Sequence, residues 1–140
     1  MTTIATDGKV VVADGLTTSN GHILSRTSVK IHRIGDEIVG CCGASDDCAA
    51  YIEALKKGED LPDIERGEFN ALHVSKRGAY LVSGGNMKRT KLILPTAIGH
   101  GSEIAEGAML AGASLMLAVK LACSRTTVSG GKLRSLTVDF

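Results

Sequence analysis

The sequence predicts an α+β fold, in which helices cover antiparallel sheets. Short apolar runs separated by turn-forming residues fill the first 43 residues, a helical pattern occupies 45–57, and two further helical patterns come only after residue 101. This order differs from the regular alternation of strand and helix that builds a parallel sheet. The length of 140 residues fits one domain spanning 1–140.

The N-terminal segment predicts a hairpin. Residues 2–6 are β-prone, Asp7 and Gly8 form the pair typical of a two-residue type I′ turn, and 9–14 contain three consecutive valines. Because the second run is apolar on both faces, we expect it to be covered on both sides. The Ser-Asn-Gly sequence at 19–21 marks another turn.

A second pair of strands is predicted at 29–34 and 37–42, followed by a helix. The helix should span 45–57, because acidic residues occupy its first turn and lysines its last. We expect Ser45 to be its N-cap and Gly58 to end it in the left-handed conformation.

The remaining elements are shorter. The helix over 114–123 is apolar nearly all round, which predicts burial on more than one side. The other expected elements are a hairpin of 71–75 and 79–83, strands at 91–94 and 96–98, a helix over 102–111 and a last strand at 132–139.

Composition excludes several functions. A net charge of +1 and 3% aromatic residues offer neither a basic surface nor a stacking platform for nucleic acid, and no attraction to a membrane. No apolar run approaches the roughly 20 residues of a membrane span, and the N-terminus is unlike a signal peptide, so we expect the cytoplasm. The four histidines and four cysteines lack metal-ligand spacing. We therefore expect no metal or cofactor, and buried cysteines.

The N-terminus offers a catalytic group. A threonine after Met1 is common and by itself uninformative, but here Thr2 begins the first predicted hairpin, which would hold it in place. Once Met1 is removed, the α-amine, with an ordinary pKa of about 8, can act as a base toward the adjacent hydroxyl. Such a site also needs a carboxylate, a cation and an N–H for the oxyanion, and the predicted strands supply Asp14, Lys30 and Gly43.

Six segments add a resemblance to this local argument. They are residues 2–4, 10–15, 28–31, 40–46, 98–102 and 129–131. In this order they resemble the proteasome β-subunits and, more closely, the bacterial HslV-type peptidases. Each segment alone has an ordinary interpretation, such as a surface lysine or a turn, but the combination covers nearly the whole chain.

The resemblance implies a four-layer αββα sandwich of the N-terminal-nucleophile (Ntn) hydrolase type, usually assembled as stacked rings with the sites inside. It implies that Thr2 is the nucleophile and base, Lys30 the activating cation and Asp14 its orienting partner. Gly43 would donate the N–H to the oxyanion, and Ser129 would hydrogen-bond on the side of the amine.

The resemblance also places a substrate cleft and a proton relay. His100 stands where the family has a serine near the amine, and Thr126 where it has an aspartate paired with the late serine. We consider His100, Ser102 and Thr126 as possible relay members. Segment 58–70 is too short and polar for the family's second long helix, near which a regulator would dock. The residues implied to line the cleft are Thr17, Thr18, Ser28, His32, Cys41 and Ser45.

The predicted function is therefore that of a cytoplasmic threonine peptidase subunit, which cleaves peptides or unfolded proteins inside a ring of identical subunits after loss of Met1. Two alternatives stay open. One is a non-catalytic ring or scaffold subunit, favoured by the two changes in the relay. The other is an Ntn amidase that acts on a small amide. A partner ATPase or cap is also left open.

Overall fold

Antiparallel pairing organises the described part of the chain into three sheets. The computed structural model describes residues 2–64, 68–85, 87–126 and 129–138. The first sheet has four strands in the order β10-β1-β2-β11, the second has five in the order β5-β6-β7-β8-β9, and β3 and β4 form a separate hairpin. The strands are β1 (Thr3–Thr6), β2 (Val10–Ala13), β3 (Thr17–Ser19), β4 (His22–Ser25), β5 (Ile31–Ile34), β6 (Glu37–Cys42), β7 (Asn70–Ser75), β8 (Gly78–Ser83), β9 (Arg89–Lys91), β10 (Thr96–Gly99) and β11 (Arg134–Thr137).

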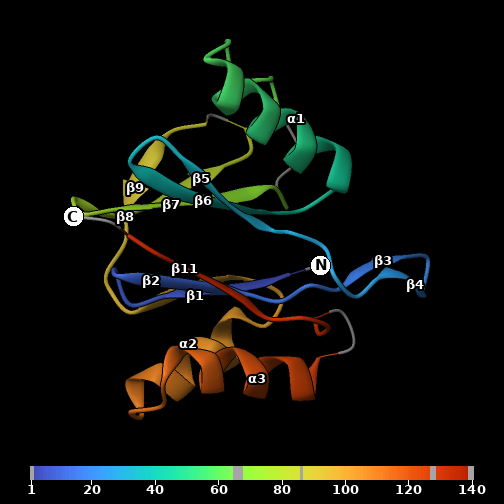
Figure 1. Ribbon diagram of the computed structural model, residues 1–140, viewed down its shortest axis with the longest axis vertical. Coiled ribbons are helices and arrows are strands. Elements are labelled where there is room, and N and C mark those ends of the chain that lie inside the picture. Colours follow the sequence, from blue (N-terminus) through green and yellow to red (C-terminus); the bar gives the residue numbers. More distant parts are fainter. Residues whose placement is uncertain (1, 65–67, 86, 127–128, 139–140) are drawn as a thin grey trace.

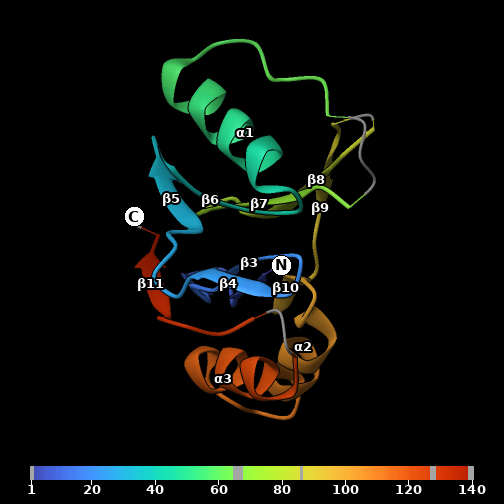
Figure 2. The same cartoon turned by 90° about the vertical axis from the view of Figure 1, so that its right-hand side faces the viewer.

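Three helices cover the outer faces of the two larger sheets. Helix α1 (Ser45–Lys57) lies on the five-stranded sheet, and α2 (Ser102–Leu110) and α3 (Leu115–Arg125) lie on the four-stranded sheet (Figures 1 and 2). The two sheets face each other between these helical layers. The predicted four-layer αββα sandwich is therefore confirmed.

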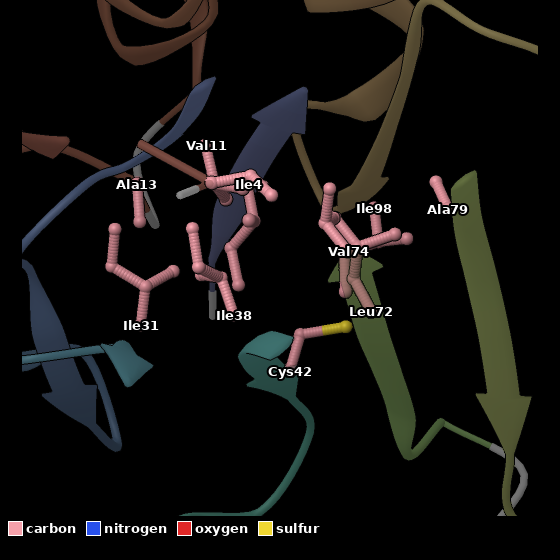
Figure 3. Close-up of a cluster of buried hydrophobic side chains, with 11 residues drawn as sticks. Ile4, Val11, Ala13, Ile31, Ile38, Cys42, Leu72, Val74, Ala79 and Ile98 are labelled. Carbon is pink, nitrogen blue, oxygen red and sulfur yellow. The ribbon is translucent and has the colours of Figure 1, made fainter. Parts of the chain in front are cut away.

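Successive side chains along a strand point to opposite faces of the sheet, so neighbouring apolar residues belong to different cores. In β2, Val11 belongs to the core between the sheets, and Val12 belongs to the core beneath α2 and α3. The prediction that this strand is covered on both sides is therefore confirmed. Figure 3 shows the core between the sheets, where Ile4 of β1 lies opposite Ile38 and Leu72 of the other sheet.

The two outer cores differ in the size of their side chains. Beneath α1, the aromatic rings of Tyr51 and Phe69 lie 5.2 Å apart and are almost fully buried. Beneath α2 and α3, the buried contact is made largely by alanines, including Ala5, Ala105 and Ala118. Small residues allow these helices to pack close to the strand that carries the N-terminus.

Two local predictions were wrong. The Asp7-Gly8 turn is longer than two residues, because Thr6 pairs with Val11 and the Asp7 carboxylate accepts hydrogen bonds from the N–H groups of Lys9 and Val10. Ser45 is not the N-cap of α1 but its first helical residue, after an extended Ala44 that makes no side-chain cap. The expected left-handed end is confirmed, since Gly58 has φ +67°.

Some boundaries also differ. The strand expected at 29–34 begins at Ile31, the strand expected at 91–94 is β9 at Arg89–Lys91, and the last strand is confined to Arg134–Thr137. Helix α3 is capped by Ser114, whose side chain accepts a hydrogen bond from the N–H of Leu117. Within the described part of the chain, no helix is long and apolar enough to cross a membrane.

Candidate active site

The chain holds Thr2 firmly at the start of β1. Thr3 pairs with Gly99 of β10, and the His100 N–H donates to the carbonyl oxygen of Thr2 at 2.8 Å. Thr2 is only 6% exposed. The residue expected to act as nucleophile is thus fixed by sheet pairing, at a position where most chains fray.

Two glycines make this anchoring possible. Gly99 has φ +96°, and a Cβ there would overlap the carbonyl oxygen of Thr2. A Cβ at Gly101 would overlap the Thr3 hydroxyl. The segment around His100 therefore packs its bare backbone against residues 2–3, which only glycine allows.

Asp14 is the electrostatic centre of this region. It lies just after β2 with its side chain fully buried, and both of its oxygens accept hydrogen bonds at 3.0–3.2 Å. A carboxylate in such a place is stable only when several donors replace its lost water. Those donors are the backbone N–H groups of Thr3, Leu16 and Gly130 and the ammonium group of Lys30.

Lys30 brings a positive charge to the same place. Its Nζ lies 3.0 Å and 3.1 Å from the two Asp14 oxygens, and its side chain is 9% exposed. Lys30 and Thr2 line the same cavity. The buried carboxylate thus holds a cation at the wall of the cavity that Thr2 also reaches.

Ser129 contacts the N-terminal strand through Thr3. Its hydroxyl lies 2.8 Å from Thr3 Oγ1, and it is 4% exposed. The next residue, Gly130, donates its N–H to Asp14 and accepts from the N–H of Gly15. The loop that the resemblance associated with the amine is thereby tied to the residue after Thr2 and to the buried carboxylate.

The cavity has a volume of about 1180 Å³ and opens beside the start of β1, between α1 and the β3–β4 hairpin. Most of the site residues predicted from the sequence line it. Asp14 and Ser129 do not line it: Asp14 binds the lining residue Lys30, and Ser129 contacts Thr3, which follows the lining residue Thr2. The expected residues that line it are Thr2, Thr17, Thr18, Ser28, Lys30, His32, Cys41, Gly43, Ser45, His100 and Ser102.

One relay candidate lies elsewhere. Thr126 follows the end of α3, away from the residues that line the cavity. Its hydroxyl is buried, and it has no hydrogen-bond partner among the residues that the structure describes. His100 and Ser102 are the relay candidates that reach the cavity.

The wall of the cavity formed by helix α1 was not predicted from the sequence. Besides Ser45, helix α1 contributes Cys48, Ala49, Ile52 and Glu53 to the cavity. These positions are spaced by three or four residues and share one helical face, so the helical period could have identified them once Ser45 was placed in the cleft. The other lining residues not foreseen as site residues are Leu16, Val29, Cys42, Ala44, Glu68, Asn70, Leu81, Ile98 and Gly99.

The cavity walls have defined polarity. Burial, with the positive charge of Lys56, lowers the pKa of His32 below its usual value, so this ring is neutral at neutral pH. The hydroxyls of Thr17 and Ser28 hydrogen-bond to each other at 2.5 Å. Gly43 has φ +125°, a conformation that side chains rarely allow, and it leads into the N-terminal end of α1.

The described residues contain no cluster of three or more histidine, cysteine or acidic side chains that could hold a metal ion. The site offers Thr2 beside the start of β1, a lysine fixed by a carboxylate and backbone groups near a helix N-terminus.

Comparison with known proteins identifies the fold. No family model matches the sequence, and no curated protein matches it significantly. Among solved structures, BPH from Thiobacillus denitrificans in complex with epoxomicin has a TM-score of 0.72 and 22% identity, covering 99% of this chain and 98% of that chain. Eukaryotic HslV from Trypanosoma brucei has a TM-score of 0.75 and 18% identity, covering 99% of each chain. This chain has the HslV fold.

A second structure of BPH, at 24% identity and a TM-score of 0.69, covers 99% of this chain and 98% of that chain. The match to the HslV fold thus extends over essentially the whole sequence. Sequence identity to these structures is 18–24%, so the likeness is one of fold.

Proposed function

We propose that this protein is the catalytic subunit of a threonine peptidase, active after Met1 is removed. The observation that supports this most is the meeting of Thr2, Lys30 and Gly43 on one cavity, with Asp14 buried behind Lys30. Each supplies a part that amide hydrolysis by a terminal threonine needs: nucleophile, cation and oxyanion donor. The carboxylate keeps the cation in position.

The proposed reaction begins at the free α-amine of Thr2. The amine takes the hydroxyl proton, and Oγ1 attacks the peptide carbonyl carbon, while the Lys30 ammonium favours the developing alkoxide. The N–H of Gly43 binds the oxyanion, the amine returns the proton to the leaving group, and an ester to Thr2 remains. A water then hydrolyses the ester. Ser129 supports the amine side through its bond to Thr3, and no cofactor takes part.

The cavity suits an extended peptide. Its lining combines the hydroxyl residues Thr17, Thr18 and Ser28, the neutral ring of His32, and one face of α1 with both apolar and polar side chains. A volume of about 1180 Å³ accommodates several residues of a substrate. We therefore assign peptides or unfolded proteins as substrates.

Labelling with epoxomicin tests the proposal directly, because BPH, which shares the fold, was solved in complex with this compound. Epoxomicin is an epoxyketone, and it should add to both the hydroxyl and the amine of Thr2. Intact mass of the cell-purified protein first establishes whether Met1 is absent. Protein without Met1 that stays unlabelled would favour a non-catalytic subunit.

Variants separate the roles. Thr2→Ala should abolish peptide hydrolysis, and Thr2→Ser should keep part of it, since a hydroxyl and an amine remain. Lys30→Ala should lower kcat/KM by about 100-fold or more. Lys76→Ala is the matched control, because Lys76 is exposed in the turn at the far end of β7 from Asn70, which lines the cavity. Equal losses in Lys30→Ala and Lys76→Ala would contradict the assignment.

His100 and Thr126 favour the second candidate, a ring subunit without activity, because the resemblance has a serine and an aspartate at these positions. His100→Ser should raise the rate if His100 has replaced the serine imperfectly, and His100→Ala should lower it. If neither change matters while Thr2→Ala does, His100 only shapes the loop. An Ntn amidase would instead cleave small amides and spare peptides.

We also propose assembly into a ring of identical subunits. Apolar side chains of α2 and α3 remain exposed on the outer layer, with Leu110 at 74%, Leu117 at 47% and Leu121 at 41%. Exposed leucines grouped on adjacent helices are typical of contact surfaces. Native mass spectrometry should show a closed oligomer, and a monomer at micromolar concentration would contradict it.

A further inference from the structure

Arg134 reaches from β11 to the segment that leads into Lys30. Strand β11 is an edge strand of the four-stranded sheet, and β5, which begins one residue after Lys30, is an edge strand of the five-stranded sheet. The two strands lie on the same side of the sandwich (Figure 2). The Arg134 guanidinium donates a partly buried hydrogen bond to the carbonyl oxygen of Ser28 at 2.7 Å. Arg134 itself does not line the cavity formed by the described residues.

Ser28 uses its hydroxyl and both of its backbone polar groups in hydrogen bonds. Its N–H donates to the carbonyl oxygen of Gly15 at 2.9 Å, and its hydroxyl lies 2.5 Å from Thr17 Oγ1. Its carbonyl oxygen accepts the bond from Arg134. Gly15 directly follows Asp14 in the chain. Ser28 is therefore tied to the residues that come just after the buried carboxylate.

The backbone of Arg134 lies near the same carboxylate. Arg134 pairs with Ala13 of β2, the residue before Asp14. A Cβ at Gly15 would overlap the carbonyl oxygen of Lys132, so these two segments pack backbone against backbone. Segments 13–15, 26–28 and 130–134 thus meet beside the ion pair of Asp14 and Lys30, and Arg134 joins two of them.

Lys30 is fixed on both sides along the chain. After it, Ile31 pairs with Gly40 of β6. Before it, only Val29, which is 54% exposed and lines the cavity, separates Lys30 from the anchored Ser28. The position of the Ser28 carbonyl group therefore limits where the Lys30 side chain can start toward Asp14. A displacement of about 1 Å in a reacting group can slow a reaction by about 100-fold.

We propose that Arg134 is a positioning residue for Lys30. By holding the Ser28 carbonyl oxygen, it keeps 28–30 where the Lys30 ammonium pairs with Asp14, on the cavity that Thr2 also lines. A guanidinium suits this role because it keeps its charge at every physiological pH, and a charged donor makes a stronger hydrogen bond. The effect on the reaction rests on the proposed function, whereas the anchoring of Ser28 does not.

The chain contains a matched control for the loss of this bond. Arg33, an exposed residue of β5, donates to the carbonyl oxygen of Thr137 in β11. It therefore makes the same kind of bond between the same two regions, three residues beyond Lys30. Arg134→Met and Arg33→Met each keep an apolar stem and remove the donors. Arg134→Lys keeps a charged donor and is the conservative variant.

Hydrogen exchange of the purified full chain, measured by mass spectrometry, tests the anchoring without any need for activity. In Arg134→Met, peptides that cover 26–31 should exchange about five times faster or more, because the bond that holds Ser28 is lost. Arg134→Lys should give an intermediate rate, and Arg33→Met should leave these peptides at the wild-type rate. Arg134→Gln, with a shorter side chain and a neutral donor, serves if the methionine variant fails to fold.

Epoxomicin labelling of protein shown to lack Met1 then measures the effect on the reaction. In Arg134→Met the maximal labelling rate should fall about tenfold or more, while the half-saturating concentration changes less than about threefold. Arg134→Lys should recover part of the rate, and Arg33→Met should be labelled like the wild type. A merely structural role would slow labelling equally in both methionine variants.

Each part of the inference can fail separately. Unchanged exchange at 26–31 in Arg134→Met, or equally faster exchange in Arg33→Met, would overturn the anchoring of Ser28. Faster exchange together with a wild-type labelling rate would overturn the effect on Lys30. Wild-type protein that lacks Met1 and is not labelled would refute the proposed function alone, because exchange would still decide whether Arg134 holds Ser28.

Discussion

Replacing Asp14 with alanine should be among the most destabilising single changes in this protein. The side chain is fully buried and accepts hydrogen bonds from Lys30 and from three backbone N–H groups. Its removal leaves the Lys30 ammonium, 9% exposed, without its carboxylate. Breaking a buried pair in this way costs about 3–5 kcal/mol. A domain of this size has about 5–15 kcal/mol of stability in total, so a large part of it would be lost.

Replacing Lys30, the ion-pair partner of Asp14, gives a comparison within the same site. In Lys30→Met the buried carboxylate keeps its three N–H donors and loses only the charged one. A hydrogen bond to a charged group contributes about 1.5–3 kcal/mol, so this variant should cost less than Asp14→Ala. Asp36→Ala is the control for an exposed pair, since Asp36 and Arg77 are 64% and 60% exposed. It should change the stability by no more than about 0.5 kcal/mol.

Urea unfolding followed by far-ultraviolet circular dichroism measures these differences, because the chain has no tryptophan for fluorescence. All variants are compared at one protein concentration, since assembly would shift the midpoint with concentration. A loss below about 1 kcal/mol for Asp14→Ala, typical of exposed pairs, would refute the reasoning. A larger loss in Lys30→Met than in Asp14→Ala would refute it equally.

Three further outcomes are expected from unfolding measurements. Gly101→Ala should destabilise the fold because its Cβ would overlap the Thr3 hydroxyl, whereas Gly107→Ala, in open space on α2, should stabilise it by up to about 1 kcal/mol; equal effects would contradict this. Burial lowers the pKa of His73 below 6.5, so the unfolded chain binds a proton that the folded chain refuses. The contribution of neutral His73 to the free energy of unfolding should be fully present above pH 6.5. Below that pH the free energy of unfolding should fall by up to about 1.4 kcal/mol per pH unit, and His73→Gln should flatten the profile. Tyr51→Phe should cost about 1–3 kcal/mol, because the Tyr51 hydroxyl lies 2.7 Å from His73 Nε2; an unchanged urea midpoint would argue against the bond.

The local elements were largely predictable because short-range chemistry specifies them. The Asn20-Gly21 turn joins the paired residues Ser19 and His22 with positive φ at both positions, as expected for a two-residue hairpin. Gly58 ends α1 in the left-handed conformation. The turn at Asp7 was predicted wrongly because its carboxylate accepts hydrogen bonds from two backbone N–H groups, those of Lys9 and Val10, which widens the turn.

The sequence by itself determined the fold class and the strand and helix order, because apolar periodicity and turn residues act over a few positions, and it supplied the candidate site residues. Only the tertiary structure decided how these residues meet. Asp14 collects donors 11, 16 and 116 positions away, so their convergence depends on how the sheets and loops pack. Packing also made Cys48 a wall of the cavity and left Thr126 outside it. Contacts between residues so far apart leave no local pattern, since their geometry exists only once both sheets have formed.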